Sequence, residues 1–158
     1  MSSSVRAVFD CNTLLQALAS PKGPAGACFK LTTNGLVSLF VSSVVVNELR
    51  NVTSRPIVIR KLRLTTERVA EFLETINIIA TSLDGFAEPF TFERDPKDAH
   101  YVNLAIAADA RLIVSRDKDL LDLMTNSMPE GRELLRRYPD FRVLNPSAFL
   151  AIVEVQPE

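Results

Sequence analysis

Short apolar runs alternate with stretches of helical spacing along this chain, and this alternation limits what it can fold into. The runs are continuously apolar, which is typical of strands covered on both faces of a parallel sheet. The alternation predicts a three-layer α/β/α fold with a Rossmann-like, mostly parallel sheet. The expected strands occupy residues 5–9, 36–41, 76–80, 111–115 and 141–144.

Local signals predict where several of the intervening helices begin. Ser42-Ser43 is suited to cap a helix that runs to about Val52, and Thr65-Thr66-Glu67 is suited to start another. Asp95-Pro96-Lys97-Asp98 combines an acidic cap with a proline that suits the first helical position. Two further helices are expected over residues 129–138 and from residue 145 onward.

The length of the chain predicts one domain, spanning residues 1–158 with a core over about 5–153. The formal net charge is −1, so overall charge indicates no partner. The longest apolar runs are too short to cross a membrane. Only Cys11 and Cys28 are present, and no signal peptide is recognised before them. These features favour a reducing, cytoplasmic setting, with both cysteines buried as small hydrophobic residues.

Four acidic residues, far apart in the sequence, are expected to meet at one edge of the sheet. Asp10 closes the first strand and Asp117 follows the fourth. Glu48 lies one turn into the helix after the second strand, and Asp98 opens the helix before the fourth. Because parallel strands end at a common edge, these carboxylates should converge where open α/β sheets bind ligands.

Clustered carboxylates raise one another's pKa unless a cation holds them ionised. Oxygen ligands suit Mg²⁺ or Mn²⁺, which retain several waters and leave room for a substrate phosphate. His100 is the only histidine, so a Cys/His zinc site is excluded. Neither the phosphate-binding loop GxxxxGK[ST] nor a GxSxG nucleophile elbow is present.

Each acid also has a purely structural interpretation. Asp95 is mainly a helix cap; Asp98 and either Asp117 or Asp119 could serve the same purpose. Glu48 taken alone is a typical solvated helix residue. Asp10 is the hardest to explain structurally, because an acid that closes an apolar strand has little evident structural purpose.

The stretch from residue 50 to 68 is strongly basic and directly follows the helix that carries Glu48. Such a run is usually a solvated face. Its functional interpretation is a surface that steers the phosphates of RNA toward an acidic cleft. The candidate RNA-binding residues are Arg50, Arg55, Arg60 and Lys61.

Four segments together resemble the PIN domain family: residues 10–14 (Asp-Cys-Asn-Thr-Leu), residues 43–49, residues 95–98 and residues 114–121. The resemblance extends over about residues 5–153. It is nearest to the prokaryotic group regarded as toxins of toxin–antitoxin systems, the VapC-like ribonucleases. It implies a PIN-like fold and Mg²⁺- or Mn²⁺-dependent ribonuclease activity. A cognate antitoxin protein and a homodimer are the partners that it implies besides RNA.

The resemblance also implies roles for individual residues. Asp10, Glu48, Asp98 and Asp117 match the metal-binding, catalytic acids, and Asp119 matches a secondary acidic position. Asn12 and Ser115 match polar positions that orient the cluster. Cys11 departs from the threonine common in the family, which removes a hydroxyl from the rim of the site but removes no ligand.

The primary hypothesis is therefore hydrolysis of RNA phosphodiester bonds at a site held by these acids. Two other classes remain open. One is a catalytically idle PIN-like module that binds RNA or protein. The other is a metal-dependent phosphatase for small substrates, which would require a deep closed pocket instead of an open groove.

Overall fold

The computed structural model describes residues 4–155, and this part of the chain contains one five-stranded sheet. The sheet has the order β3-β2-β1-β4-β5, and every neighbouring pair is parallel, as the sequence predicts. Its strands are β1 (Val5–Phe9), β2 (Val37–Val41), β3 (Thr81–Ser82), β4 (Leu112–Val114) and β5 (Arg142–Leu144).

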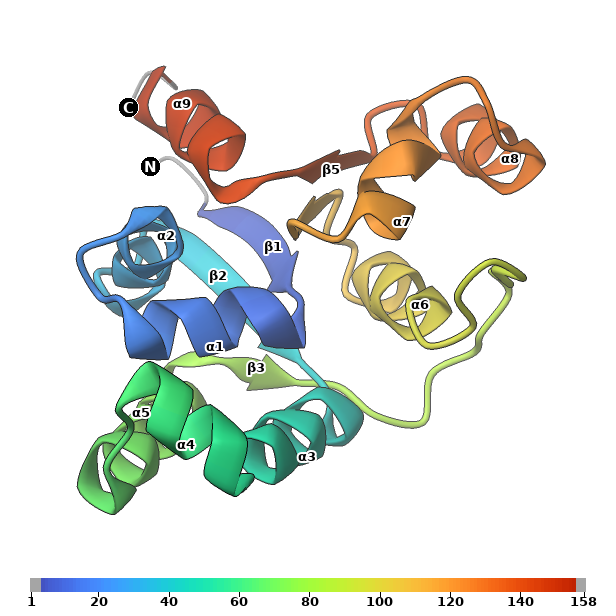
Figure 1. Ribbon diagram of the computed structural model, residues 1–158. Coiled ribbons are helices and arrows are strands. Elements are labelled where there is room, and N and C mark those ends of the chain that lie inside the picture. The colour runs from blue at the N-terminus through green and yellow to red at the C-terminus, as the bar shows by residue number, and fades with distance from the viewer. Residues whose placement is uncertain (1–3, 156–158) are drawn as a thin grey trace.

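The central strands are buried because helices cover both faces of the sheet. On β1, Val8 aligns with Phe40 of β2 on one side and with Ile113 of β4 on the other. In Figure 1, α1, α2 and α9 lie on one side of β1, and α6 lies on the other side. The helices are α1 (Cys11–Ala19), α2 (Pro24–Thr33), α3 (Ser43–Val52), α4 (Pro56–Leu62), α5 (Thr66–Ile79), α6 (Ala99–Ala107), α7 (Lys118–Leu121), α8 (Pro129–Arg137) and α9 (Pro146–Val155).

Two predicted helix starts are confirmed by their capping hydrogen bonds. The hydroxyl of Ser42 accepts from the backbone N–H of Val45 at 3.3 Å, and that of Thr65 accepts from the N–H of Arg68 at 3.1 Å. These bonds satisfy amide groups that the first turn of a helix leaves without partners. Ser42 thereby sets where α3 begins, and so where Glu48 lies one turn later.

The predicted strand over residues 76–80 is wrong. Residues up to Ile79 belong to α5, and the strand that completes this edge is only Thr81–Ser82, paired with Phe40 and Val41. Ile76 continues the helical spacing of the preceding apolar residues and is buried, whereas Ile78 is 71% exposed. A short apolar run can belong to a strand or a helix, and here the established helix simply continues.

The basic stretch contains a helix that the sequence interpretation did not include. Helix α4 begins at Pro56, in the first helical position, and ends at Leu62; Arg63 follows as its C-cap with a left-handed φ of 54°. None of its residues is buried, and Ile57 is 69% exposed. The helix therefore contributes surface, and little to the core.

The order of the strands places the point where the chain reverses direction across the sheet between β1 and β4. From β1 the chain moves outward through β2 to β3, then returns to add β4 and β5 on the other side of β1. This reversal is the point at which open α/β sheets bind ligands, beyond the carboxyl ends of the strands. Asp10 follows β1 there and Ser115 follows β4. None of the helices described over residues 4–155 has both the length and the apolar character needed to span a bilayer.

Candidate metal centre

Asp10 combines a capping role with a buried position in the site. It is only 4% exposed, and its Oδ1 accepts from the backbone N–H of Thr13 at 2.8 Å, so it is the N-cap of α1. Asp10 was expected to have little structural purpose, and this capping bond is a structural role that the sequence interpretation missed. Its Oδ2 accepts a short hydrogen bond from the hydroxyl of Ser115. Burial raises the pKa of Asp10, although the bonds from Ser115 and Thr13 act to lower it.

Ser115 connects the ends of the two central strands. While donating to Asp10, its hydroxyl accepts from the backbone N–H of Asp117 at 2.9 Å. Asp117 in turn caps α7, because its Oδ1 accepts from the N–H of Asp119 at 2.8 Å. One fully buried hydroxyl thus sets the relative positions of Asp10 and the turn that carries Asp117.

Asp98 has the least satisfied carboxylate of the group. It is 6% exposed, and it precedes α6 without a capping bond from its side chain. Among the described residues, its Oδ2 is buried and has no hydrogen-bond partner. Burial raises the pKa of Asp98, and the negative charges of Asp117, Asp95 and Asp10 raise it further. An unpartnered buried oxygen surrounded by acids is poorly solvated when ionised, unless a cation compensates.

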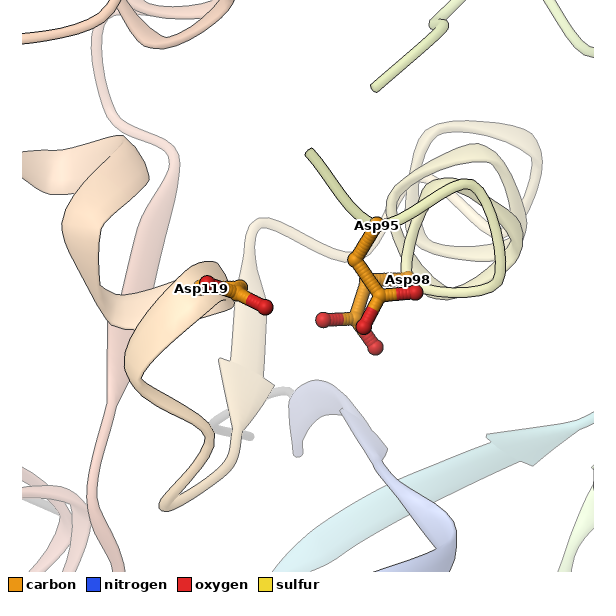
Figure 2. A group of neighbouring side chains, drawn as sticks. All are labelled: Asp95, Asp98 and Asp119. Atoms are coloured by element: carbon orange, nitrogen blue, oxygen red, sulfur yellow. The ribbon is translucent and has the colours of Figure 1, made fainter. Parts of the chain in front are cut away.

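The tightest group of carboxylates differs from the predicted set. Oxygens of Asp95, Asp98 and Asp119 lie within 4.8 Å of one another. Figure 2 shows Asp95 and Asp98 on the turn before α6, opposite Asp119 on α7. Asp95 does act as a cap, because its Oδ1 accepts from the N–H of Lys97 at 3.1 Å. Asp95 also belongs to the acidic cluster, whereas the sequence analysis predicted it mainly as a cap.

Glu48 reaches the same edge of the sheet from α3, where its side chain is exposed. The hydroxyl of Tyr101 donates to Glu48 Oε2 at 3.2 Å and accepts from the backbone N–H of Cys11 at 3.0 Å. Tyr101 is 6% exposed and lies one turn into α6. The contact joins Glu48 to the residue directly after Asp10. Of the four predicted acids, only Asp98 belongs to the group whose oxygens lie within 4.8 Å of one another in the described part of the chain.

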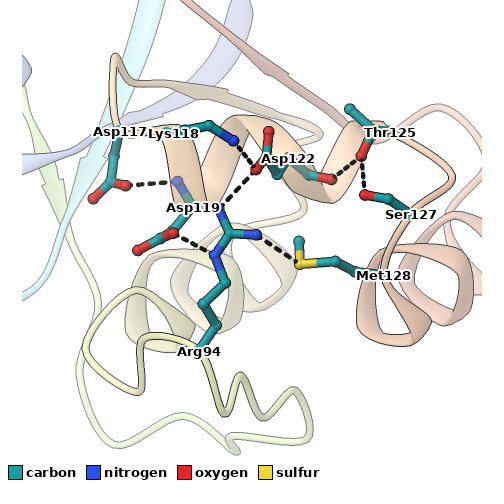
Figure 3. Close-up of polar contacts among 8 residues, drawn as sticks. All are labelled: Arg94, Asp117, Lys118, Asp119, Asp122, Thr125, Ser127 and Met128. Atoms are coloured by element: carbon teal, nitrogen blue, oxygen red, sulfur yellow. Dashed lines mark hydrogen bonds and ion pairs between the residues drawn. The ribbon is translucent and has the colours of Figure 1, made fainter.

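Arg94 neutralises the outer side of the cluster. Its guanidinium donates a short bond to Asp119 and a 2.7 Å bond to Asp122, while Lys118 donates to the same Asp122 oxygen at 2.7 Å. Figure 3 shows Arg94 between these two acids, with Met128 also in contact. Hydrogen bonds from Lys118 and Arg94 lower the pKa of Asp122. Asp119 and Asp122 therefore already have internal counter-charges.

The donor set fits a hard divalent cation. The side chains at this edge offer carboxylate oxygens, the ligands that Mg²⁺ and Mn²⁺ prefer. The unpartnered Oδ2 of Asp98 supplies an oxygen that no protein group among those described satisfies. The raised pKa values of Asp10 and Asp98 show that their ionised forms are disfavoured in the protein alone, and a bound cation would stabilise those forms. The acidic cluster is thus compatible with metal binding.

The candidate RNA-binding side chains are exposed on α3, on α4 and on the turn between them. Arg50, Arg55, Arg60 and Lys61 all face solvent, and none forms an ion pair within residues 4–155. The charge of Arg55 is felt at Cys11, directly beside Asp10. Of the four candidate residues, Arg55 is therefore the one that acts on a group next to the acidic edge.

Other predicted residues differ in how closely they engage the cluster. Asn12 is exposed, and no hydrogen bond of its side chain is found within the described part of the chain. Cys11 and Cys28 are both buried and free, as expected. Burial, with the nearby charge of Glu48, raises the pKa of Cys11 to about 12, so its thiol is unreactive at neutral pH.

Three groups that contact the acidic residues were not predicted from the sequence: Arg94, Asp122 and the hydroxyl of Tyr101. Arg94 immediately precedes the Asp95-Pro96-Lys97-Asp98 turn, which places a cation beside predicted acids. Tyr101 follows Asp98 by three residues, a spacing that puts both on one face of a helix and could have indicated its place near the acids.

Comparison with known proteins agrees with this architecture. The search of curated proteins returned no match. A family model described as the PIN domain matches residues 6–119, which span β1 through β4 and include all four predicted acids. PIN domains are generally nucleases that use divalent metals, so the match indicates a nuclease-type function. Because this match covers most of the chain, the chain belongs to the PIN domain family.

Proposed function

We propose that this protein is a Mg²⁺- or Mn²⁺-dependent endoribonuclease that hydrolyses phosphodiester bonds of single-stranded or structured RNA. The observation that carries the proposal is Asp98, whose buried Oδ2 lacks a partner in the described structure while three other acids raise its pKa. Such an arrangement is unfavourable by itself and becomes favourable when a cation binds.

Asp10, Glu48, Asp98 and Asp117 would hold the cation, with Asp95 and Asp119 beside them. A bound divalent cation lowers the pKa of its water ligand and neutralises charge on the scissile phosphate. Ser115 and the N–H of Thr13 fix the orientation of the Asp10 carboxylate. Because they restrict its rotation before the cation arrives, less freedom is lost on binding.

Glu48, besides holding the cation, would act on water, and the basic residues would act on the substrate. Glu48 is exposed while held by Tyr101, so its free oxygen can orient an attacking water or accept a proton from it. Arg50, Arg55, Arg60 and Lys61 supply positive charge for the phosphates on either side of the cleaved bond. The preference for RNA comes from the resemblance to VapC-like ribonucleases.

RNA cleavage with Mn²⁺ or Mg²⁺ tests the proposal directly. Wild type should cleave a single-stranded RNA and leave the DNA of the same sequence largely intact, and EDTA should stop the reaction. Asp10→Asn and Asp98→Asn should each lower the rate of cleavage by about 10²-fold or more. Equal cleavage by all three proteins would sink the assignment. Failure of wild type to bind Mn²⁺ in calorimetry would instead favour an idle PIN-like binding module.

We further propose that the protein acts in the cytoplasm as the toxin of a toxin–antitoxin pair and forms a homodimer. The two free, buried cysteines support a reducing compartment. The neighbouring open reading frame should encode a small protein with a DNA-binding pattern. Expression of wild type alone should arrest growth, and co-expression of that neighbour should restore it. Growth arrest by Asp98→Asn as well would count against the nuclease as its cause.

A further inference from the structure

The hydroxyl of Tyr101 lies where three acidic segments meet. It donates to Glu48 Oε2 at 3.2 Å and accepts from the N–H of Cys11, next to Asp10, at 3.0 Å. The backbone N–H of Tyr101 donates to the carbonyl of Asp98 at 3.1 Å. One side chain near the start of α6 therefore connects α3 with the start of α1.

Glu48 depends on this contact for its orientation. It lies on an exposed position of α3, where a glutamate would otherwise sample several rotamers in water. Its bond to Tyr101 is the one hydrogen bond or ion pair found for its side chain within residues 4–155. The neighbouring Asp10 is held by two partners and is buried, so it needs no such guide.

We propose that Tyr101 is a positioning residue that presents Glu48 to the divalent cation. The inference rests on the metal site of the proposed function, and it assigns the hydroxyl a task separate from that of the ring. The ring is buried in α6 and packs edge-on against His100, with centroids 6.3 Å apart. Phenylalanine would retain that packing, so the two tasks can be tested separately.

A purely structural role is the competing explanation. The hydroxyl also satisfies the backbone N–H of Cys11, and loss of that acceptor would leave a buried donor without a partner. Such a defect would act on the β1–α1 turn and therefore on Asp10. The experiment must distinguish an effect that passes through Glu48 from one that passes through this turn.

The first measurement compares Tyr101→Phe with Tyr138→Phe in Mn²⁺ titrations followed by calorimetry. Tyr138 is the only other tyrosine; its ring stacks on Arg111, and no hydrogen bond of its hydroxyl is found in the described structure. Tyr101→Phe should weaken Mn²⁺ binding about tenfold, the effect typical when a group that orients a ligand is lost. Tyr138→Phe should bind as wild type does. Unchanged affinity in Tyr101→Phe would overturn the inference.

The second measurement repeats the comparison without the Glu48 carboxylate. In a Glu48→Ala background, Tyr101→Phe should cause no further loss of Mn²⁺ affinity, because Tyr101 has nothing left to orient. A purely structural role predicts the same fold loss in both backgrounds. Such an equal loss would reject positioning through Glu48, even if Tyr101→Phe is also less stable.

A crystal structure of metal-free Tyr101→Phe gives a readout that requires no nuclease activity. The Glu48 carboxylate should move away from the β1–α1 turn, while Asp10 retains its bonds to Ser115 and Thr13. A Glu48 side chain that stays in place would refute the inference. If wild type neither binds Mn²⁺ nor cleaves RNA, the proposed function fails by itself, whatever the position of Glu48.

Discussion

The acidic edge has two sides that handle negative charge differently. On the inner side, Asp10 and Asp98 are buried and have no cationic partner among the described residues, and their pKa values are raised. On the outer side, Asp119 and Asp122 share Arg94, and Lys118 adds a second cation. The inner side requires a charge that the protein does not supply, whereas the outer side already has one.

This contrast assigns different tasks to acids that look alike in the sequence. An acid with an internal counter-ion is stable without a metal and gains less when one binds. An acid without a counter-ion gains the most from a cation, so metal affinity should depend chiefly on the inner side. Variants that remove a carboxylate or a counter-ion from one side test this difference between the two sides.

The largest effect is expected in a comparison of two single variants, one that removes a carboxylate from the inner side and one that removes a carboxylate from the outer side. Asp98→Asn should lower the rate of RNA cleavage by about 10²-fold or more, because a ligand that sustains several kcal/mol of transition-state stabilisation is lost. Asp122→Asn keeps the shape of its side chain and lies outside the inner group, so its rate should stay near that of wild type. Single-turnover cleavage at saturating Mn²⁺ measures both. Similar losses in the two variants would remove the distinction between the sides.

The second prediction concerns stability against pH in EDTA. Asp98 has a folded-state pKa above its ordinary 3.8, so the folded protein retains a proton that the unfolded chain has released. Stability should therefore fall as pH rises from about 4 toward neutrality, by at most about 1.4 kcal/mol per pH unit for each such proton. Asp10 shifts in the same direction.

Asp98→Asn should flatten this decline and should be more stable than wild type at neutral pH without metal. Urea unfolding at several pH values measures the slopes. Asp122 provides the opposite sign: because its pKa is lowered from the ordinary 3.8, it contributes stability that is fully present above that value and is lost as pH falls below it. Parallel slopes for wild type and Asp98→Asn would show that Asp98 titrates normally, and would remove the electrostatic argument for the inner side.

The same contrast shows what the sequence can and cannot predict. The caps Ser42 and Thr65 are local, since residue type and a spacing of three suffice to identify them. Convergence of Asp10, Asp98 and Asp117 follows from a parallel sheet, which the apolar runs indicate. Whether an acid has a counter-ion is not local: Arg94 meets Asp119 across 25 positions, and no periodicity reveals that.

Errors in the predicted fold have a similar origin. Residues 76–79 are apolar enough for a strand, yet they extend helix α5, which begins at Thr66, ten residues before Ile76. Helix α4 has no buried residue, so the sequence lacked the buried apolar stripe from which a helix is usually predicted. The capping role of Asp10 was not predicted, because its bond to Thr13 depends on where α1 begins.

A third prediction tests whether the positive charge that binds the RNA phosphates comes from the basic stretch, which belongs to neither side of the acidic edge. Arg55→Gln/Arg60→Gln/Lys61→Gln should raise the KM for RNA about tenfold at moderate salt and leave Mn²⁺ affinity unchanged. The salt dependence of log KM should weaken by about 0.7 for each RNA phosphate that the variant no longer neutralises. Lys30→Gln is the control, because Lys30 is exposed near the end of α2, which leads into the start of β2 at the opposite edge of the sheet. An unchanged salt slope in the triple variant would exclude these residues from RNA binding.

The smallest effect, and the sharpest test of the contrast, comes from removing the counter-ion of the outer side. Arg94→Gln leaves Asp119 without its guanidinium partner, next to Asp95 and Asp98. The outer side should then behave like the inner one, so Mn²⁺ affinity should rise severalfold, a modest gain because the ion pair is partly exposed to solvent. Lys118→Gln is the matched control: it removes a cation from Asp122 but leaves Asp119 paired, so Mn²⁺ affinity should not change. If Arg94→Gln binds Mn²⁺ no better than Lys118→Gln does, then Asp119 does not reach the cation, and Arg94 serves only to join the turn before α6 to α7.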